Sequence, residues 1–412
     1  MSDAPLDQIL AELDATRAER EELYIHFHRN PELSLQEHAT AATIHETLAA
    51  EGIDVRRVGA TGLVATLTNG AGPTVAMRAD IDALPVKEAS GKEYASTATQ
   101  VDEATGVEVP VSHVCGHDFH AACLAGALIA LHRHRERWSG TFVGVFQPAE
   151  EIAAGARGMV DDGVAEAMPT PDVYLGQHVL SSLPGGHVGA TAGPVLSSGT
   201  SIRVTVHGRG SHGSMPELSV DPVVLAASIV MRLQTIVARE VPARATAVVT
   251  VGAIQAGTKS NIIPDSAELL INTRAYDENV AQHLHAAIER IVRSECDGAR
   301  SPREPEFEYY DVYPLTDNDE AATKLVRSAF DDFFGDASTD LAPVPASEDF
   351  SVIPDALGVP YVYWGIGGFA DQDNAPGNHN PAFAPDLQPT LDVGTQAIIV
   401  AAAPWLLPET QR

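Results

Sequence analysis

The chain has 412 residues, of which 44% are hydrophobic and 20% charged, so two or three ordinary globular domains are expected. Its formal net charge of -30 at pH 7 excludes nucleic acid and anionic membrane surfaces as partners, because so acidic a surface repels both. No secretory signal pattern opens the chain, no apolar run reaches the ~18 residues of a membrane span, and three cysteines are too few for a disulfide framework, so we expect a cytoplasmic protein without transmembrane segments.

The first half alternates helical and strand patterns. Helices are expected at 6–30, 35–51 and 119–134, and strands at 63–67, 73–78, 141–147 and 172–178. Strands separated by helices predict an α/β domain with a mixed, mostly parallel sheet. In such sheets ligands lie beyond the carboxyl ends of the strands. Five polar residues follow these ends and are therefore expected to converge: Asp80, Asp82, Glu150, Glu151 and His178.

The pattern changes after about residue 199. Strands at 201–208, 245–255, 266–275 and 306–313 and helices at 221–238 and 279–296 follow one another in the order βαββαβ. This order predicts a ferredoxin-like domain inserted into the first. The remaining chain returns to α/β, with a helix at 320–334, a strand at 360–364 and a helix at 390–407. We therefore predict a catalytic domain formed by residues 1–198 and 314–412, and an inserted domain at 199–313.

The segment 113–120, His-Val-Cys-Gly-His-Asp-Phe-His, places Cys115 and His117 two residues apart. Alone, this pair is compatible with a buried thiol and a surface imidazole. Two adjacent carboxylates, Glu150 and Glu151, follow a predicted core strand, where burial is costly unless a cation compensates them. His178 could be a satisfied core histidine, but His379 lies in a Gly/Pro-rich loop that gives little reason for burial. Thiolate, imidazole and carboxylate together favour a transition-metal site.

Six motifs follow one another along the chain: Met77–Pro85, His113–His120, Gln147–Glu151, Gly176–His178, Ser347–Phe350 and Asn378-His379. In this order they resemble the amidohydrolase branch of the M20 metallopeptidases, with its hippurate hydrolases, indole-acetyl-amino-acid hydrolases and aminoacylases. The similarity covers nearly the whole chain, and three further stretches, beginning at Trp138, Met159 and Gly394, look most similar to bacterial Nα-acyl-glutamine aminoacylases.

The resemblance implies two divalent metal ions, Zn or alternatively Mn or Co, with the Cys115 thiolate bridging them. Glu150 would be the general base that deprotonates water and then protonates the leaving amine. Asp82 would orient a ligand, and His120 is left either at the site or in a structural role. The implied ligands are Cys115, His117, Glu151, His178 and His379.

The resemblance also assigns residues of the inserted domain, which would act as a lid and form a homodimer. His212 would stabilise the oxyanion, within its own chain or across the dimer. Asn261 and Arg274 would bind the substrate carboxylate, the alternative for Arg274 being a surface salt bridge. Glu217 stands where many relatives have a second histidine, which leaves the substrate side chain undetermined.

Three hypotheses follow. The first is a metal-dependent hydrolase that cleaves the amide of an N-acyl amino acid into a carboxylic acid and a free amino acid. The second is a dipeptidase or aminoacyl peptidase on the same site, which would need an acidic group near the acyl pocket to bind a free α-amino group. The third is a non-catalytic metal-binding protein, which the presence of Glu150 disfavours because metal binding alone does not require that residue.

Overall fold

The structure, a computed structural model, describes residues 5–407, and the chain divides into two compact units. The first unit takes residues up to 195, residues 317–342 and residues from 349 onward. The second takes residues 196–316 and 343–348. This second unit contains the residues of the predicted insertion, 199–313, and in addition the segment 343–348 from later in the chain.

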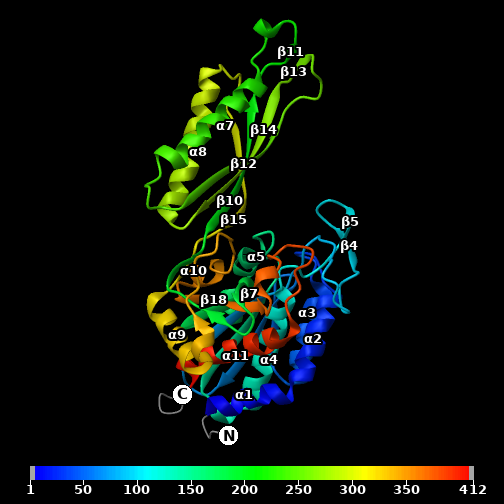
Figure 1. The fold of residues 1–412 in the computed structure, drawn as a ribbon, viewed down its shortest axis with the longest axis vertical. Coiled ribbons are helices and arrows are strands. Elements are labelled where there is room, and N and C mark those ends of the chain that lie inside the picture. The colour runs from blue at the N-terminus through cyan, green and yellow to red at the C-terminus, as the bar shows by residue number, and fades with distance from the viewer. Residues whose placement is uncertain (1–4, 408–412) are drawn as a thin grey trace. The chain divides into compact units, whose positions relative to one another are not determined.

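The first unit is built on an eight-stranded sheet with the order β1-β2-β6-β3-β7-β18-β8-β17. Figure 1 labels its neighbouring strands β7 and β18. The four central strands of the sheet are β6, β3, β7 and β18, and they run parallel to one another. The pairs β1–β2, β2–β6 and β8–β18 are antiparallel. The predicted mixed α/β class is therefore confirmed. The strands are β1 (Asp54–Val58), β2 (Gly62–Asn69), β3 (Thr74–Asp80), β6 (Gly140–Gln147), β7 (Val173–Pro184), β8 (Val188–Gly189), β17 (Ser338–Thr339) and β18 (Tyr361–Phe369).

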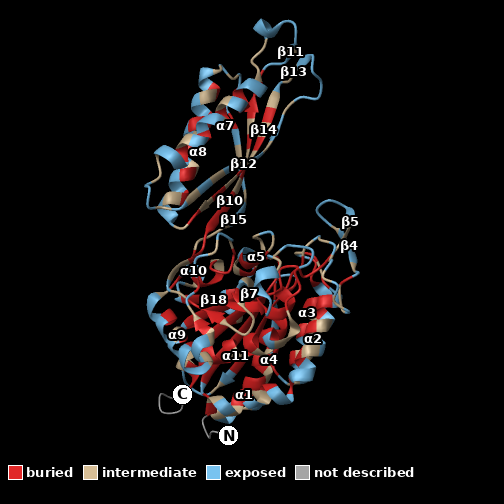
Figure 2. Ribbon diagram, viewed as in Figure 1, coloured by how far each residue is buried: buried red, intermediate tan, exposed pale blue. Residues whose placement is uncertain are grey.

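Helix α4 forms the centre of this unit's core. It packs against β3, β6 and β7 and against the helices α2, α3 and α11, so nearly all of its residues are buried (Figure 2). A helix covered on all sides needs small apolar residues all round, and its sequence is rich in alanine. The helices of the unit are α1 (Pro5–Ala15), α2 (Arg17–Arg29), α3 (His38–Ala50), α4 (His117–Arg133), α5 (Gly155–Asp161), α6 (Val164–Ala167), α9 (Glu320–Phe334), α10 (Val352–Leu357) and α11 (Leu387–Leu406).

The predicted helix 6–30 is two helices that separate at Thr16. The Thr16 hydroxyl donates to the Glu12 carbonyl over 2.9 Å and accepts from Arg20 over 2.8 Å. A side chain that bonds nearby groups in this way competes with regular helix geometry, which explains the break. The prediction also missed β1 and the exposed hairpin of β4 (Thr99–Asp102) and β5 (Val107–Pro110).

The second unit has the order β10, α7, β12, β14, α8, β15, in an antiparallel sheet arranged β12-β14-β10-β15. Burial alternates along β14 because both helices pack on the sheet and form one core with it. The elements are β10 (Ser198–His207), α7 (Pro222–Arg239), β12 (Ala247–Gln255), β14 (Ser266–Ala275), α8 (Glu278–Gly298) and β15 (Glu306–Tyr313), with a small ribbon of β11 (Ser211–His212) and β13 (Ile262–Ile263).

Helix α7 is the one helix among the described residues whose length and composition would allow it to cross a membrane. A third of the relevant window is buried, and the helix packs on the sheet of the second unit. A single helix of this kind is weak support for a membrane span, because a core helix passes the same test.

Candidate metal centre

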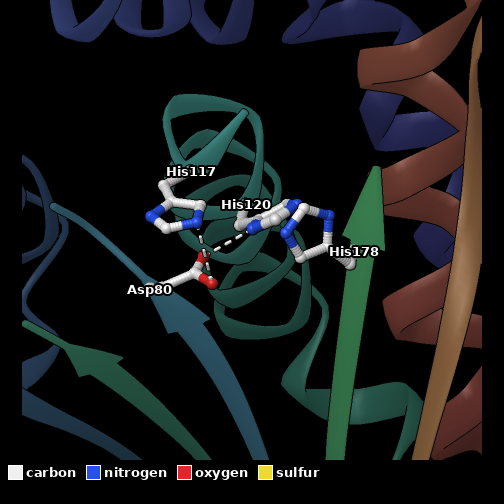
Figure 3. A group of neighbouring side chains, drawn as sticks. All are labelled: Asp80, His117, His120 and His178. Atoms are coloured by element: carbon white, nitrogen blue, oxygen red, sulfur yellow. Dashed lines mark hydrogen bonds and ion pairs between the residues drawn. The ribbon is translucent and has the colours of Figure 1, made fainter. Parts of the chain in front are cut away.

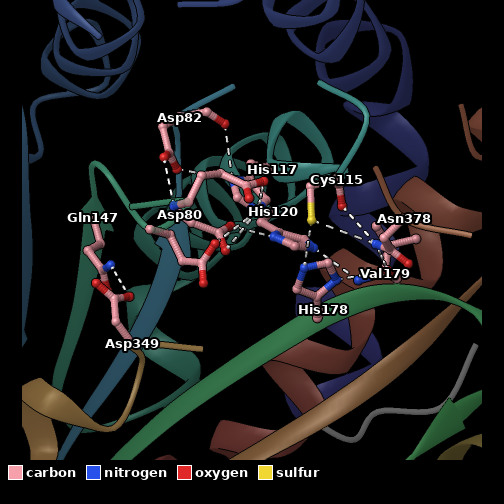
Figure 4. Close-up of polar contacts among 12 residues, drawn as sticks. Asp80, Asp82, Cys115, His117, His120, Gln147, His178, Val179, Asp349 and Asn378 are labelled. Atoms are coloured by element: carbon pink, nitrogen blue, oxygen red, sulfur yellow. Dashed lines mark hydrogen bonds and ion pairs between the residues drawn. The ribbon is translucent and has the colours of Figure 1, made fainter. Parts of the chain in front are cut away.

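The donor residues lie where parallel strands of the first unit end and helix α4 begins. Asp80 ends β3, Glu150 follows the end of β6, and His178 lies within β7. His117 is the first residue of α4. Asp80 and Glu150 thus lie at strand ends as expected, whereas His178 lies inside β7, which continues to Pro184. Figure 4 shows the side chains of Asp80, His117 and His178 near Cys115.

His117 and His178 each have one ring nitrogen engaged and one turned toward other donor residues. The Nδ1 of His117 lies 3.0 Å from the Asp82 carbonyl and 3.1 Å from Asp82 Oδ1. The Nδ1 of His178 lies 2.8 Å from the Val179 carbonyl. Because these oxygens accept, Nδ1 carries a proton in both rings, and Nε2 is the nitrogen left for a metal. This is the tautomer that metal-binding histidines adopt.

The five predicted ligands form one group, which we call the donor cluster. The Nε2 of His178 lies 3.4 Å from Cys115 Sγ, and the Nε2 of His379 lies 3.3 Å from Glu151 Oε2. Glu151 belongs to two sets of donor atoms that lie within 4.8 Å of one another, one with Cys115 and His379 and one with His117 and Glu150. A carboxylate shared in this way is suited to two neighbouring ions.

His120, whose role the sequence left open, is not available as a ligand. Its Nδ1 lies 2.5 Å from Asp80 Oδ1 (Figure 3). Its Nε2 accepts the Val179 N–H over 3.0 Å. Asp80 is held in turn by Arg78, whose Nη1 lies 2.7 Å from Asp80 Oδ2. With both ring nitrogens bonded, His120 has a structural role although it packs against His117 and His178. We call Arg78, Asp80 and His120 the closed network.

Two atoms of the donor cluster are buried without a hydrogen-bond partner among the described residues, His117 Nε2 and Glu151 Oε1. They lie 3.7 Å apart. Buried polar atoms in native proteins are normally bonded, so this pair indicates a missing partner. A cation satisfies both at once, and the mixed set of thiolate, imidazole and carboxylate suits Zn or a related divalent ion. The residues present therefore fit the metal that the sequence implies.

The ionisation of the cluster leads to the same conclusion. Burial, followed by the charge of Glu151, raises the pKa of the Cys115 thiol to about 12. Burial also raises the pKa of Glu151 to about 8. Without a cation both groups would hold protons at neutral pH. Metal binding displaces such protons, so the affinity for the metal should increase with pH.

The candidate substrate residues all lie in the second unit. The ribbon of β11 and β13 brings His212 near Asn261, whose carbonyl accepts the Gly213 N–H over 2.8 Å. The Nδ1 of His212 accepts the Ser214 N–H over 3.2 Å, which leaves the proton on Nε2. Arg274 lies in β14 and donates to Asn272 over 3.1 Å and to Ser347. Among the described residues, its partners are neutral, and the surface salt bridge considered above is not seen.

The sequence analysis missed several residues that support the cluster. Asn378 donates to the carbonyls of Cys115 and Val179 over 3.2 and 3.3 Å, so it links the Cys115 backbone to strand β7, which carries His178. Ser34 donates to Asp82 Oδ2 over 2.7 Å. For Asn378, its position next to His379 was a usable signal, whereas nothing in the sequence pattern distinguishes Ser34.

Comparison with known proteins relates residues 76–400 to the family described as "Peptidase family M20/M25/M40". The chain is 37% identical over 329 residues to thermostable carboxypeptidase 2 of Saccharolobus solfataricus, covering 79% of this chain and 80% of that protein. It is 32% identical over 380 residues to an N-acetylcysteine deacetylase of Bacillus subtilis, covering 90% and 92%. A solved Bacillus subtilis structure, described as a dinuclear metal-binding peptidase of family M20, matches with a TM-score of 0.78 and 29% identity over 94% of this chain and 98% of that one.

Proposed function

The chain belongs to peptidase family M20/M25/M40, and from that premise we propose that it is a metal-dependent amidohydrolase that cleaves N-acyl amino acids into a carboxylic acid and a free amino acid. The match to the family model and the similarity to the N-acetylcysteine deacetylase confirm the family resemblance seen in the sequence. The observation that carries the proposal is the donor cluster, whose buried unpartnered atoms, His117 Nε2 and Glu151 Oε1, lie beside Glu150. Such a site combines metal ligands with a carboxylate that metal binding alone does not require.

Glu150 is the general base of the proposed reaction. Its Oε2 lies 3.9 Å from His117 Nε2, so it borders the position where the ligands converge. When bound, divalent ions supply Lewis acidity toward water and toward a carbonyl oxygen. The Glu150 carboxylate takes a proton from the attacking water and returns it to the nitrogen of the leaving amine. Asp82 keeps His117 oriented through its Nδ1–H, as outer partners of metal ligands do.

The residues of the second unit are proposed to bind the substrate. The tautomer of His212 presents Nε2–H as a donor for the oxygen that becomes negative during attack. Asn261 and the Arg274 guanidinium are suited to the free carboxylate on the amine side of the scissile bond. A lid function of this unit follows from the same assignment.

A second candidate is a peptidase on the same site, and the likeness to a carboxypeptidase favours it. Both reactions break an amide next to an amino acid with a free carboxylate. They differ in the acyl side, where a dipeptide brings a charged α-amino group. The two candidates are therefore separable by substrate.

Three finer assignments complete the proposal. Zinc is the proposed metal, with manganese or cobalt as alternatives, because all three accept this donor set. A homodimer through the second unit is supported by exposed apolar residues on α7, notably Val224 and Met231 at 65% and 71% exposure. It is also supported by β12, an edge strand of the sheet in which no residue is buried.

A cytoplasmic location is supported by three free, buried cysteines.

The test is a panel of N-acyl amino acids, the matching N-acyl amino-acid amides and unblocked dipeptides, with amine release followed by mass spectrometry. Chelator-sensitive release from the acylated acids supports the aminoacylase assignment. Release from dipeptides alone would move the protein to the peptidases. Metal-loaded protein that releases no amine from any substrate would contradict both candidates.

A further inference from the structure

Glu37, the residue before helix α3, lies far in sequence from every ligand yet contacts the loop that carries Glu150. Its side chain is completely buried. Oε1 accepts two backbone N–H groups, from Leu35 over 3.0 Å and from Ala149 over 2.8 Å. Oε2 accepts the hydroxyl of Thr61 over 2.8 Å. One carboxylate thus joins three separate segments of the first unit.

Both backbone groups held by Oε1 belong to residues in the left-handed region. Leu35 has φ 64° and Ala149 has φ 49°. Residues with a Cβ adopt such angles at a cost of about 1–3 kcal/mol, which the surroundings must compensate. The loop after Ala149 is also tight, because a Cβ on Gly155 would lie 1.5 Å from the Pro148 carbonyl oxygen. The backbone conformation around Glu150 is therefore stabilised by contacts with other parts of the chain, because the residues of this loop do not favour it by themselves.

The N–H groups of the two residues that flank Glu150 are held by two different buried carboxylates. Glu37 accepts from the Ala149 N–H, and Asp82 Oδ2 accepts from the Glu151 N–H over 3.0 Å. Burial and then the charge of Asp82 raise the pKa of Glu37 to about 7, which shows that an acidic group is unfavourable at this position. The position nevertheless holds a glutamate, whose side chain accepts hydrogen bonds from Leu35, Thr61 and Ala149.

We propose that Glu37 is a positioning residue that fixes the direction of Glu150 by clamping the Ala149 N–H. The inference rests on the proposed role of Glu150 as general base. Glu37 does not touch the reacting atoms and is not a metal ligand. Its loss should leave the donor cluster able to bind metal, while the base moves away from the position of the attacking water.

The experiment compares Glu37→Ala and Glu37→Gln with the parent protein and with Glu46→Ala as matched control, since Glu46 is an exposed glutamate on helix α3, which directly follows Glu37. A glutamine carbonyl can still accept both N–H groups, and its amide can donate to Thr61. We expect Glu37→Ala to lower kcat by about 10- to 100-fold, as misplacement of a catalytic group does, with KM and metal content unchanged. Glu37→Gln should recover most of this loss, and Glu46→Ala should behave like the parent.

Hydrogen exchange at the Ala149 amide provides the readout that does not depend on activity. It should become faster in Glu37→Ala and stay near the parent rate in Glu37→Gln. The proposal is overturned by unchanged kcat or unchanged exchange in Glu37→Ala, by loss of metal together with activity, or by a glutamine variant as impaired as the alanine variant. If the parent protein hydrolyses no substrate, the proposed function fails, whereas the exchange measurement still decides whether the clamp exists.

Discussion

The donor cluster and the closed network lie side by side in the first unit and both contain histidine and carboxylate side chains, but their hydrogen bonding differs. In the donor cluster, the Nδ1 atoms of His117 and His178 bond backbone oxygens, whereas the Nε2 of His178 faces Cys115 Sγ. Among the described residues, His117 Nε2 and Glu151 Oε1 have no hydrogen-bond partner. In the closed network, both nitrogens of His120 are bonded. For these three histidines, the difference is that the Nε2 of His117 and of His178 faces other members of the donor cluster, whereas the Nε2 of His120 bonds the backbone.

The proximity of four residues would otherwise suggest another assignment. Donor atoms of Asp80, His117, His120 and His178 lie within 4.8 Å of one another and could by distance alone hold an ion. The Asp80 carboxylate, however, already bonds Arg78 and His120. A metal there would have to break buried, charge-assisted hydrogen bonds, which are among the stronger ones in proteins. We therefore assign the metal to the donor cluster and a supporting role to the closed network.

The largest effect is expected for Glu150→Gln, which tests whether the donor cluster catalyses a reaction as well as binding metal. Loss of a general base should reduce kcat by about 100- to 10,000-fold, because glutamine cannot accept the proton of the attacking water. The metal content should remain that of the parent protein, as measured by atomic emission. Turnover close to that of the parent would remove Glu150 from the role of base.

The comparison itself is tested by two histidine variants, His178→Ala and His120→Ala. The first variant removes a ligand. Loss of a residue that only orients a ligand weakens metal binding by about 10- to 100-fold, and the effect of His178→Ala should be larger than this. The second leaves Asp80 Oδ1 and the Val179 N–H unpaired and should reduce the free energy of unfolding by about 1–3 kcal/mol per group. Metal titration and denaturant unfolding of both variants check this, and the reverse pattern would exchange the two roles.

A third kind of buried histidine, one whose ring is positively charged, is represented by His28. His28 lies between Asp118 and Glu88, with Nδ1 at 2.6 Å from one carboxylate and Nε2 at 3.0 Å from the other. Burial alone lowers its pKa, but these two carboxylates raise it to about 9. Because the folded pKa exceeds the unfolded value of about 6.5, the stabilisation is complete below pH 6.5 and is lost as the pH rises through 9.

The difference in unfolding free energy between the parent and His28→Gln should therefore be largest near pH 6 and shrink by pH 10. Its size should be on the order of 3 kcal/mol or less. Urea unfolding at several pH values measures it, with His45→Gln, an exposed position on α3, as control. A difference that does not depend on pH would show that His28 is neutral in the folded protein.

The sequence allowed prediction of features that are carried by residue types and by periodicity. The parallel strands and α4 were expected because their apolar runs are long, and a transition-metal site was expected because thiol, imidazole and carboxylate side chains occur together. The set of five ligands came from the resemblance to the M20 metallopeptidases. The role of His120 could not be predicted, because it depends on the Val179 N–H, which the folded sheet brings to its ring. Glu37 was missed for the same reason, since its contact with Ala149 joins residues that are far apart in the chain.

The central claim is that the donor cluster holds two divalent ions. Equilibrium dialysis of metal-free protein against zinc, followed by elemental analysis, tests it most directly, with Cys115→Ala and His379→Ala beside the parent. The account predicts two ions per chain in the parent and fewer in both variants. One ion or none in the parent, or two ions in both variants, would contradict it.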